Sequence, residues 1–275
     1  MDYKKRSLKL PVRWEDAPVR VKFWERLRSA KRWLLLLDYD GTLAPFHMDR
    51  MKATPYEGVV ERLEPILALP QGRVVVVSGR QIDDLKQLLK LRHPVEIWGS
   101  HGREHLLPDG QYRLVDLTPE ERRVVDGLTA GMRELGFGGQ LELKPTAVAV
   151  HWRGLPEGAH KRLREAAEKL FTESKPPETL ELMPFESGVE LRSRSRTKGQ
   201  VVAEILAEEP GEIPSAFLGD DWTDEDGFAE IHGHGLGLLV RTQVRESCAD
   251  YFLTPPDALL LFLEEWLDNA KRNTR

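Results

Sequence analysis

The chain has 275 residues, of which 40% are hydrophobic and 31% charged, and its formal net charge is −5. These values are typical of a soluble globular protein with enough core for one large domain or two smaller ones. The negative charge argues against a surface that binds nucleic acid or a membrane. A single cysteine, Cys248, excludes an internal disulfide framework and a multi-cysteine zinc site, and we expect a cytoplasmic protein.

The first 24 residues are locally basic, but they lack the apolar core of a signal peptide. We therefore interpret them as a solvated leader that lies along the surface. The longest apolar runs of the chain are far too short to span a bilayer.

Two apolar runs, Trp33–Leu37 and residues 74–77, follow the leader. Their hydrophobicity is continuous rather than alternating, which is typical of strands covered on both faces in a parallel sheet. Each run is followed by a stretch with helical spacing, at residues 56–69 and 82–91. This alternation of strand and helix predicts an α/β core.

Residues 104–189 show a different pattern. Short alternating strands are predicted at residues 111–115, 140–144, 147–152 and 179–183, around polar helices at residues 120–135 and 159–173. Such alternation is typical of an antiparallel sheet with one face open to water. We therefore expect an α+β insert at residues 104–189, between the core segments 1–103 and 190–275.

The last part of the chain returns to the first pattern. A helix is predicted at residues 198–208 with Thr197 as its N-cap. A weaker apolar run at residues 216–218 and an amphipathic helix at residues 258–269 follow. The predicted fold class is α/β, with a parallel sheet flanked by helices and interrupted by the α+β insert.

Polar residues of an unusual kind follow each of the three apolar runs. In chain order they are Asp38, Asp40 and Thr42, then Ser78 and Arg80, then Asp220, Asp221 and Asp224. Because ligands bind at the carboxyl ends of strands in open parallel sheets, we expect these sets to meet in one crevice. Lys198 lies at a predicted helix start, where free N–H groups favour an anion.

Several carboxylates cannot persist in one pocket unless their pKa values rise or a cation binds. Asp38 and Asp40 project the same way from an extended chain, and Asp220 and Asp221 would join them. Oxygen ligands favour a hard ion, and we expect Mg²⁺. One aspartate would then attack phosphorus while the other donates a proton, and Thr42 can hold a phosphate oxygen.

Each motif also has an ordinary interpretation. Asp-x-Asp-Gly-Thr occurs in turns, Ser-Gly-Arg in loops and Thr-Lys-Gly at helix starts, and the acidic run at residues 220–226 can be a solvated face. Four such motifs in this order, three of them at the ends of apolar runs, favour the catalytic interpretation.

The order of these motifs resembles that of the haloacid dehalogenase superfamily of aspartate-nucleophile phosphatases, over the whole chain. The resemblance implies a Rossmann-like core with an inserted cap of the C2 type. It also implies that Asp38 is the nucleophile, that Asp40 is the general acid and base, and that Ser78 and Lys198 hold the phosphate. The magnesium ligands would be Asp38, the main-chain carbonyl of Asp40, and Asp220, supported by Asp221 and Asp224.

Within this superfamily, further stretches are similar to those of trehalose-6-phosphate phosphatases. They are DYDGTLAP, VSGR, GSHG at residues 99–102, KPTAVAVHWR at residues 144–153, GVE at residues 188–190, and GDDWTDED. The family often carries Arg-Pro soon after the glutamate, where this chain reads ELRSRSR.

A disaccharide presents hydroxyl groups in every direction, so a specific site needs charged groups at fixed positions. The candidate substrate-binding residues are Arg80, His101, Lys144, His151, Arg153 and Glu190. The alternative is that Lys144 and Arg153 are solvated strand ends and that His151 packs within the insert.

The sequence thus predicts a Mg²⁺-dependent phosphatase that converts trehalose 6-phosphate to trehalose through an aspartyl phosphate. We expect a monomer whose partner is a phosphorylated disaccharide, and neither a nucleic acid nor a membrane. Sucrose 6-phosphate and mannosyl-3-phosphoglycerate are alternative substrates. A phospho-sugar sensor or a receiver-like domain is the alternative outside sugar phosphatases, and Asp40 argues against it because a sensor needs no general acid.

Overall fold

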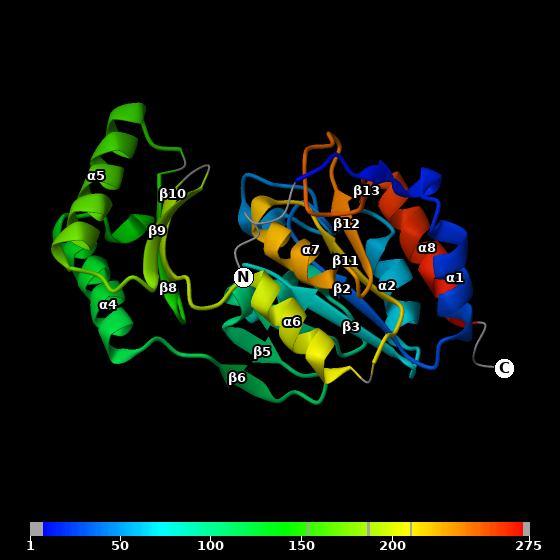
Figure 1. Cartoon of the computed structure of the whole chain (residues 1–275). Helices are drawn as coiled ribbons and strands as arrows, with labels where there is room; N and C mark the ends of the chain where they lie inside the picture. The colour runs from blue at the N-terminus through cyan, green and yellow to red at the C-terminus, as the bar shows by residue number, and fades with distance from the viewer. Residues whose placement is uncertain (1–7, 153, 186–187, 210, 272–275) are drawn as a thin grey trace. The chain divides into compact units, whose positions relative to one another are not determined.

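The computed structural model describes residues 8–152, 154–185, 188–209 and 211–271. It divides into two compact units (Figure 1): a core unit of Met1–Arg113 and Thr197–Arg275, and an insert unit of Leu114–Arg196. The sequence placed the insert at residues 104–189. The core unit extends past residue 104 because β5 (Glu104–Leu106) pairs with β4 (Glu96–Gly99). The insert unit extends past residue 189 because β10 (Gly188–Ser193) pairs with the insert strand β8 (Ala147–His151).

The predicted α/β fold is confirmed. The main sheet has nine strands among the described residues, in the spatial order β1, β13, β12, β11, β2, β3, β4, β5, β6. Pairing is parallel from β1 to β4, and β5 is antiparallel to β4. The strands not yet delimited are β1 (Val12–Arg13), β2 (Trp33–Leu37), β3 (Gly72–Val77), β6 (Tyr112–Leu114), β11 (Ser215–Gly219), β12 (Leu236–Val240) and β13 (Tyr251–Leu253).

Helices cover both faces of this sheet (Figure 1). Strand β2 is buried along its whole length, because alternate leucines enter two different hydrophobic clusters. Leu35 and Leu37 pack in the cluster that includes residues of α1, α2, α3 and α8, and Leu34 and Leu36 pack in the one that includes residues of α6 and α7. These helices are α1 (Arg20–Ser29), α2 (Val59–Leu67), α3 (Ile82–Leu89), α6 (Lys198–Glu208), α7 (Glu225–Ile231) and α8 (Asp257–Lys271).

The prediction of a solvated leader is wrong for the residues that the structure describes. Strand β1 pairs with β13, and α1 buries Phe23 and Trp24. Trp14 lies edge-to-face against both rings, with centroid distances of 6.0 and 5.6 Å. These aromatic rings are buried in one hydrophobic cluster with Phe262 and Trp266 of α8. The segment therefore packs on the core, although the basic residues between the rings favoured a solvated segment.

The insert unit is an antiparallel sheet in the order β7, β8, β10, β9, with two helices. Leu128 and Met132 of α4 and Leu163 of α5 share a hydrophobic cluster with Val148 and Val150 of β8. The remaining elements are β7 (Leu141–Lys144), β9 (Leu180–Phe185), α4 (Pro119–Glu134) and α5 (Glu157–Glu173). Among the described residues, no helix combines the length and apolar character that crossing a bilayer requires.

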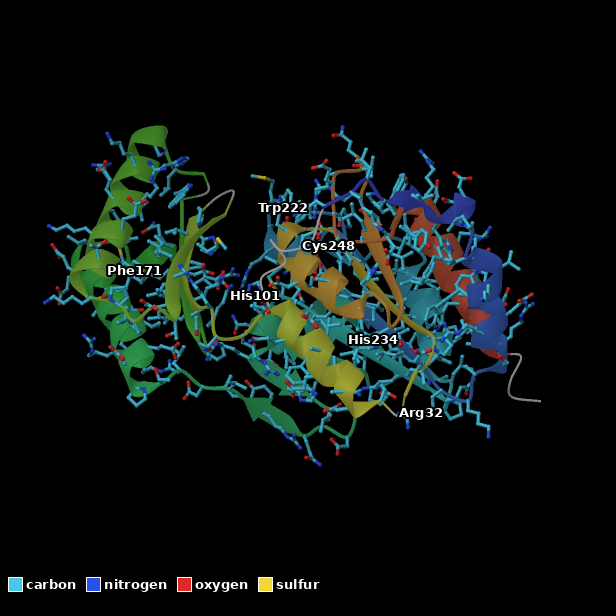
Figure 2. All side chains as sticks on the ribbon, viewed as in Figure 1. Arg32, His101, Phe171, Trp222, His234 and Cys248 are labelled. Carbon is cyan, nitrogen blue, oxygen red and sulfur yellow. The ribbon has the colours of Figure 1, made fainter. Side chains whose placement is uncertain are left out.

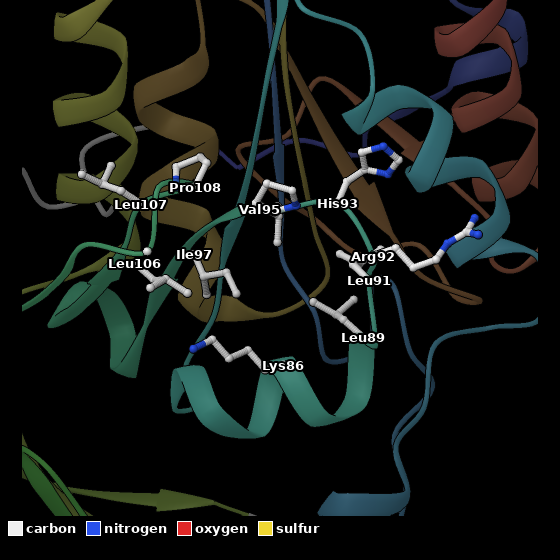
Figure 3. A pocket seen from close by; sticks show the side chains of 12 residues that line it. Lys86, Leu89, Leu91, Arg92, His93, Val95, Ile97, Leu106, Leu107 and Pro108 are labelled. Carbon is white, nitrogen blue, oxygen red and sulfur yellow. The ribbon is translucent and has the colours of Figure 1, made fainter.

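A cavity of about 380 Å³ lies where β4 begins (Figure 3). Val95, Ile97 and Leu106 form part of its apolar lining, and Lys86 of α3 adds a charged group. None of the site residues that were predicted from the sequence and that the structure describes lines this cavity.

Candidate active site

Three neighbouring strands place the predicted residues at one edge of the sheet. Strand β2 lies between β11 and β3, so that Leu37 is paired with Leu218 on one side and Val76 on the other. Asp38, Ser78 and Asp220 each come directly after one of these strands. The N–H of Asp38 donates to the carbonyl of Leu218 at 2.9 Å, which continues the sheet by one residue into the site.

Three buried aspartates form a cluster at this edge. Carboxylate oxygens of Asp38, Asp220 and Asp224 all lie within 4.8 Å of one another. Lys198 Nζ donates to Asp38 Oδ1 at 2.7 Å and to Asp224 Oδ1 at 2.6 Å. Lys198 is the first residue of α6, whose start is fixed by a capping box between Thr197 and Gln200.

Asp224 and Gly41 give the cluster its geometry. Asp224 Oδ2 accepts the N–H groups of Asp220 and Asp221, both at 3.0 Å, and so closes the loop after β11. Asp221 itself is exposed and caps the turn that follows. Gly41 has φ +75°, and a Cβ there would lie 2.1 Å from Asp220 Oδ2, so a side chain at this position would displace the carboxylate.

The cluster holds three carboxylates and one ammonium group, so its charges are unbalanced. Burial raises the pKa of Asp38 to about 7, with further raising by Asp224 and Asp40 against the opposing effect of Lys198. Burial and the charges of Asp38 and Asp224 raise the pKa of Asp220 to about 9. Burial alone would lower the pKa of Lys198, but Asp224 and Asp38 outweigh it and raise that pKa. An all-oxygen donor set with excess negative charge fits a hard divalent cation.

Two hydroxyl groups lie buried in the loops at this edge. Thr42 Oγ1 is buried and has no hydrogen-bond partner among the residues that the structure describes. Such an orphaned hydroxyl is unfavourable unless a ligand supplies the partner. Ser78 is also buried, and its Oγ accepts the N–H of Arg80 at 3.2 Å.

Arg80 holds the carboxylate of Asp40. Its Nε donates to Asp40 Oδ2 and its Nη2 to Asp40 Oδ1, both at 2.6 Å, while its Nη1 donates to the carbonyl of Arg50 at 2.7 Å. The side chain of Asp40 is therefore directed to a guanidinium and is not one of the three clustered carboxylates. No pattern in the sequence indicated that Arg80 and Asp40 form a pair.

His101 lies in a left-handed turn, with φ 57°, next to the loop that carries Ser78. A Cβ added at Gly79 would lie 2.6 Å from the His101 ring, so the two loops are in close contact. Figure 2 shows His101 near the start of α6, the helix that carries Lys198.

The insert unit brings its own predicted residues together. Lys144 Nζ donates to Glu190 Oε1 at 2.7 Å, and His151 Nε2 lies 2.8 Å from Glu142 Oε2. Glu142 also lies 3.9 Å from the Lys144 ammonium. Arg153 lies outside the described residues.

Sequence reasoning missed Glu142. The available signal was its spacing, because Glu142 and Lys144 are two residues apart in β7 and therefore share a face of the strand. The register adds that Glu142 and Glu190 both pair with Ala149 of β8, from opposite sides, which sequence spacing does not reveal.

Comparison with known proteins identifies the family. A family model described as trehalose-phosphatase matches residues 36–257. The trehalose-6-phosphate phosphatase of Escherichia coli K12 is 30% identical over 216 residues, which are 78% of each chain. A Mycobacterium tuberculosis protein described as an uncharacterized glycosyl hydrolase is 30% identical over 261 residues, and a Mycobacterium marinum trehalose-phosphate phosphatase is 30% identical over 223. Both are much longer proteins, of which the matched part covers 19% and 55%.

Solved structures show the same fold. The C-terminal domain of Candida albicans trehalose-6-phosphate phosphatase superposes with a TM-score of 0.74 at 20% identity, and the match covers 96% of this chain and 99% of that one. A haloacid dehalogenase-like hydrolase of Bacteroides thetaiotaomicron gives a TM-score of 0.63 at 17% identity, covering 85% and 98%. The chain belongs to the trehalose-phosphatase family.

Proposed function

We propose that this chain is a phosphatase that hydrolyses trehalose 6-phosphate to trehalose and inorganic phosphate. The observation that carries the proposal is the buried cluster in which Lys198 contacts both Asp38 and Asp224 beside Asp220. Such a cluster combines a nucleophilic carboxylate with the positive charge that a phosphoryl group requires. The family match and the name of the E. coli relative support the choice of sugar.

The cofactor in this proposal is Mg²⁺. Asp38, Asp220 and Asp224 are the side chains that would hold the ion, because their oxygens are already gathered. The ion would supply positive charge against the carboxylates and the phosphoryl oxygens. Asp221 is exposed, so we assign it to capping the loop.

The chain's own residues account for the bond changes. Asp38 attacks phosphorus, the bond from phosphorus to the sugar oxygen breaks, and that oxygen takes a proton from Asp40. A water molecule then gives a proton to Asp40 and attacks the aspartyl phosphate, which releases phosphate and restores Asp38. Thr42, Ser78 and Lys198 hold the phosphoryl oxygens during both steps.

We assign Arg80 to holding Asp40, in place of the predicted contact with the sugar. Both oxygens of Asp40 accept a hydrogen bond from Arg80, and each keeps a second lone pair for the transferred proton. Arg80 thereby holds the carboxylate of Asp40 in one place between the attack of Asp38 and the attack of water.

The insert unit supplies polar groups for the disaccharide in this proposal. Lys144, Glu190, Glu142 and His151 form a connected set of charged and polar groups, and such groups can exchange their mutual hydrogen bonds for sugar hydroxyls. The monomeric state and the cytoplasmic location stay predictions from the sequence.

The test is phosphate release from trehalose 6-phosphate, sucrose 6-phosphate and mannosyl-3-phosphoglycerate, each with Mg²⁺ and with a chelator. We expect turnover of trehalose 6-phosphate with Mg²⁺ and little without it. A preference for the phosphoglycerate ester would contradict the proposed sugar. Tight binding of a sugar phosphate without turnover would instead support a sensor.

A further inference from the structure

We propose that Glu104 is a positioning residue for the phosphate-binding loop Ser78-Gly79-Arg80, and that it acts through a left-handed turn at Ser100–Gly102. The inference rests on the proposed function, because it assigns that loop to the phosphoryl group and to Asp40. Glu104 belongs to the core unit and lies outside the motifs from which the site was predicted.

The turn has an unfavourable backbone conformation. Ser100, His101 and Gly102 have φ values of 50°, 57° and 93° in succession. The left-handed region suits glycine, whereas Ser100 and His101 carry a Cβ that crowds the following carbonyl. Residues persist in this region only where their surroundings hold them there, and they gather at functional sites.

This conformation directs two successive N–H groups to the phosphate-binding loop. The N–H of Ser100 donates to the carbonyl of Arg80 at 2.7 Å, and the N–H of His101 donates to the carbonyl of Ser78 at 3.0 Å. The two bonds fix both ends of Gly79. The loops pack too closely for side chains at two glycines, since a Cβ at Gly99 would lie 2.8 Å from the Arg80 carbonyl oxygen and one at Gly79 would meet the His101 ring.

Glu104 supplies the restraint that the turn requires. Its Oε2 accepts the Ser100 hydroxyl at 2.5 Å, and its Oε1 accepts the Tyr112 hydroxyl at 3.1 Å. The residue is 4% exposed and lies in β5, which pairs with β4. A carboxylate anchored in the sheet therefore holds Ser100, and Ser100 and His101 in turn hold the loop that carries Ser78 and Arg80.

The first experiment compares Glu104→Ala with Glu64→Ala in the full chain. Glu64 is a buried glutamate of the same unit, and its oxygens accept the N–H of Arg92 and contact the His93 ring, away from the loops. Both variants should lower the melting temperature. Only Glu104→Ala should lower kcat/KM, by about 10-fold to 100-fold, because a small displacement of positioned groups has this effect, and it should weaken inhibition by inorganic phosphate. Equal kinetics in the two variants would overturn the proposal.

A second experiment tests the route through Ser100. Glycine accepts a positive φ without a side-chain restraint, so Glu104→Ala should reduce kcat/KM far less in a Ser100→Gly background than in the wild type. An equal reduction in both backgrounds would contradict action through the turn. If Glu104→Ala does not fold, Ser100→Ala removes the same hydrogen bond and should also lower kcat/KM. Glu104→Gln keeps an acceptor oxygen for the Ser100 hydroxyl, so it should keep most of the wild-type kcat/KM.

The wild-type assay separates this inference from the proposed function. Failure of the wild type on trehalose 6-phosphate would refute the proposed substrate alone. The ratio of variant to wild type, measured on whichever sugar phosphate the wild type hydrolyses, decides the role of Glu104.

Discussion

Single residues in the site combine burial with an incomplete set of partners. Thr42 Oγ1 is buried without a hydrogen-bond partner among the described residues, and the Lys198 ammonium is shared between the carboxylates of Asp38 and Asp224. Buried polar groups that lack hydrogen-bond or charge partners lower the stability of the fold. The arrangement becomes favourable when a phosphoryl group and a cation complete it, which is why we assign these residues to the proposed reaction.

Replacing Thr42 with valine tests this reasoning. Valine has nearly the same shape and removes only the orphaned hydroxyl, so the melting temperature should stay constant or rise. The value of kcat/KM should fall by about 5-fold to 150-fold, which corresponds to about 1–3 kcal/mol for an unmade hydrogen bond. Steady-state kinetics and thermal unfolding of the same samples check both parts. An unchanged kcat/KM would show that Thr42 does not hold the phosphoryl group.

The order of motifs along the chain predicted that Asp38 and Asp220 lie close together, because the carboxyl ends of neighbouring parallel strands meet. Lys198, expected at a helix start, contacts Asp38. The pair between Arg80 and Asp40 and the contact of Glu142 with His151 were not predicted. From the sequence alone, a charged residue on a strand or loop is predicted to be solvated. Only the register of the sheet shows which oppositely charged residue lies beside it. The register is set by packing over the whole sheet, so the sequence carries no local signal for it.

At the scale of elements, helix α6 brings the charge of Lys198 to the aspartate cluster. Its capping box satisfies N–H groups at the start of the helix, and Lys198 follows the cap directly. The position of Lys198 and the stability of α6 therefore depend on the same residue, Thr197. Helix α4 begins with a capping box of the same kind at Thr118, in the insert unit.

This pair of caps offers a matched test. Thr197→Ala and Thr118→Ala should each cost about 1 kcal/mol in the free energy of unfolding. Only Thr197→Ala should also lower kcat, because the first turn of α6 carries Lys198. Urea unfolding and initial rates measure the two effects. A Thr197→Ala enzyme with the kcat of the wild type would mean that packing alone positions Lys198.

Helices and strands were predicted best where the segment showed a single hydrophobic pattern. The run Trp33–Leu37 coincides with β2, and the helix expected at residues 198–208 coincides with α6. Helix α1 was missed because five of its ten residues are charged, although Phe23, Trp24 and Leu27 are buried. Strand β12 was missed because its glycine interrupts an otherwise apolar run, yet it is buried throughout.

At the scale of the whole molecule, a buried glutamate ties several elements of the core unit together. Glu96 of β4 accepts two hydrogen bonds from Arg73 of β3, both at 2.9 Å, and lies 3.0 Å from the ring of His105 of β5. Arg73 also contacts Glu208 of α6. Burial alone would raise the pKa of Glu96, but the hydrogen bonds from His105 and Arg73 outweigh it and lower the pKa to about 2.

This pKa predicts the acid sensitivity of the fold. A carboxyl group with a lowered pKa contributes stability at pH values above its unfolded pKa and loses that stability as the pH falls towards the folded value. Between pH 5 and pH 3, Glu96 should therefore account for a loss of about 2 kcal/mol in the free energy of unfolding. Urea unfolding of the wild type and of Glu96→Gln measures this. Parallel pH profiles for the two proteins would contradict the assignment.

In the proposed reaction, Asp38, within the cluster of buried carboxylates around Lys198, attacks phosphorus. The most direct measurement is mass spectrometry of the enzyme after acid quenching during turnover of trehalose 6-phosphate with Mg²⁺. We expect one phosphoryl group on the peptide that contains Asp38, and none on the Asp38→Asn variant, which should keep its fold but lose turnover. A phosphoryl group on another residue, or steady turnover by Asp38→Asn, would contradict it.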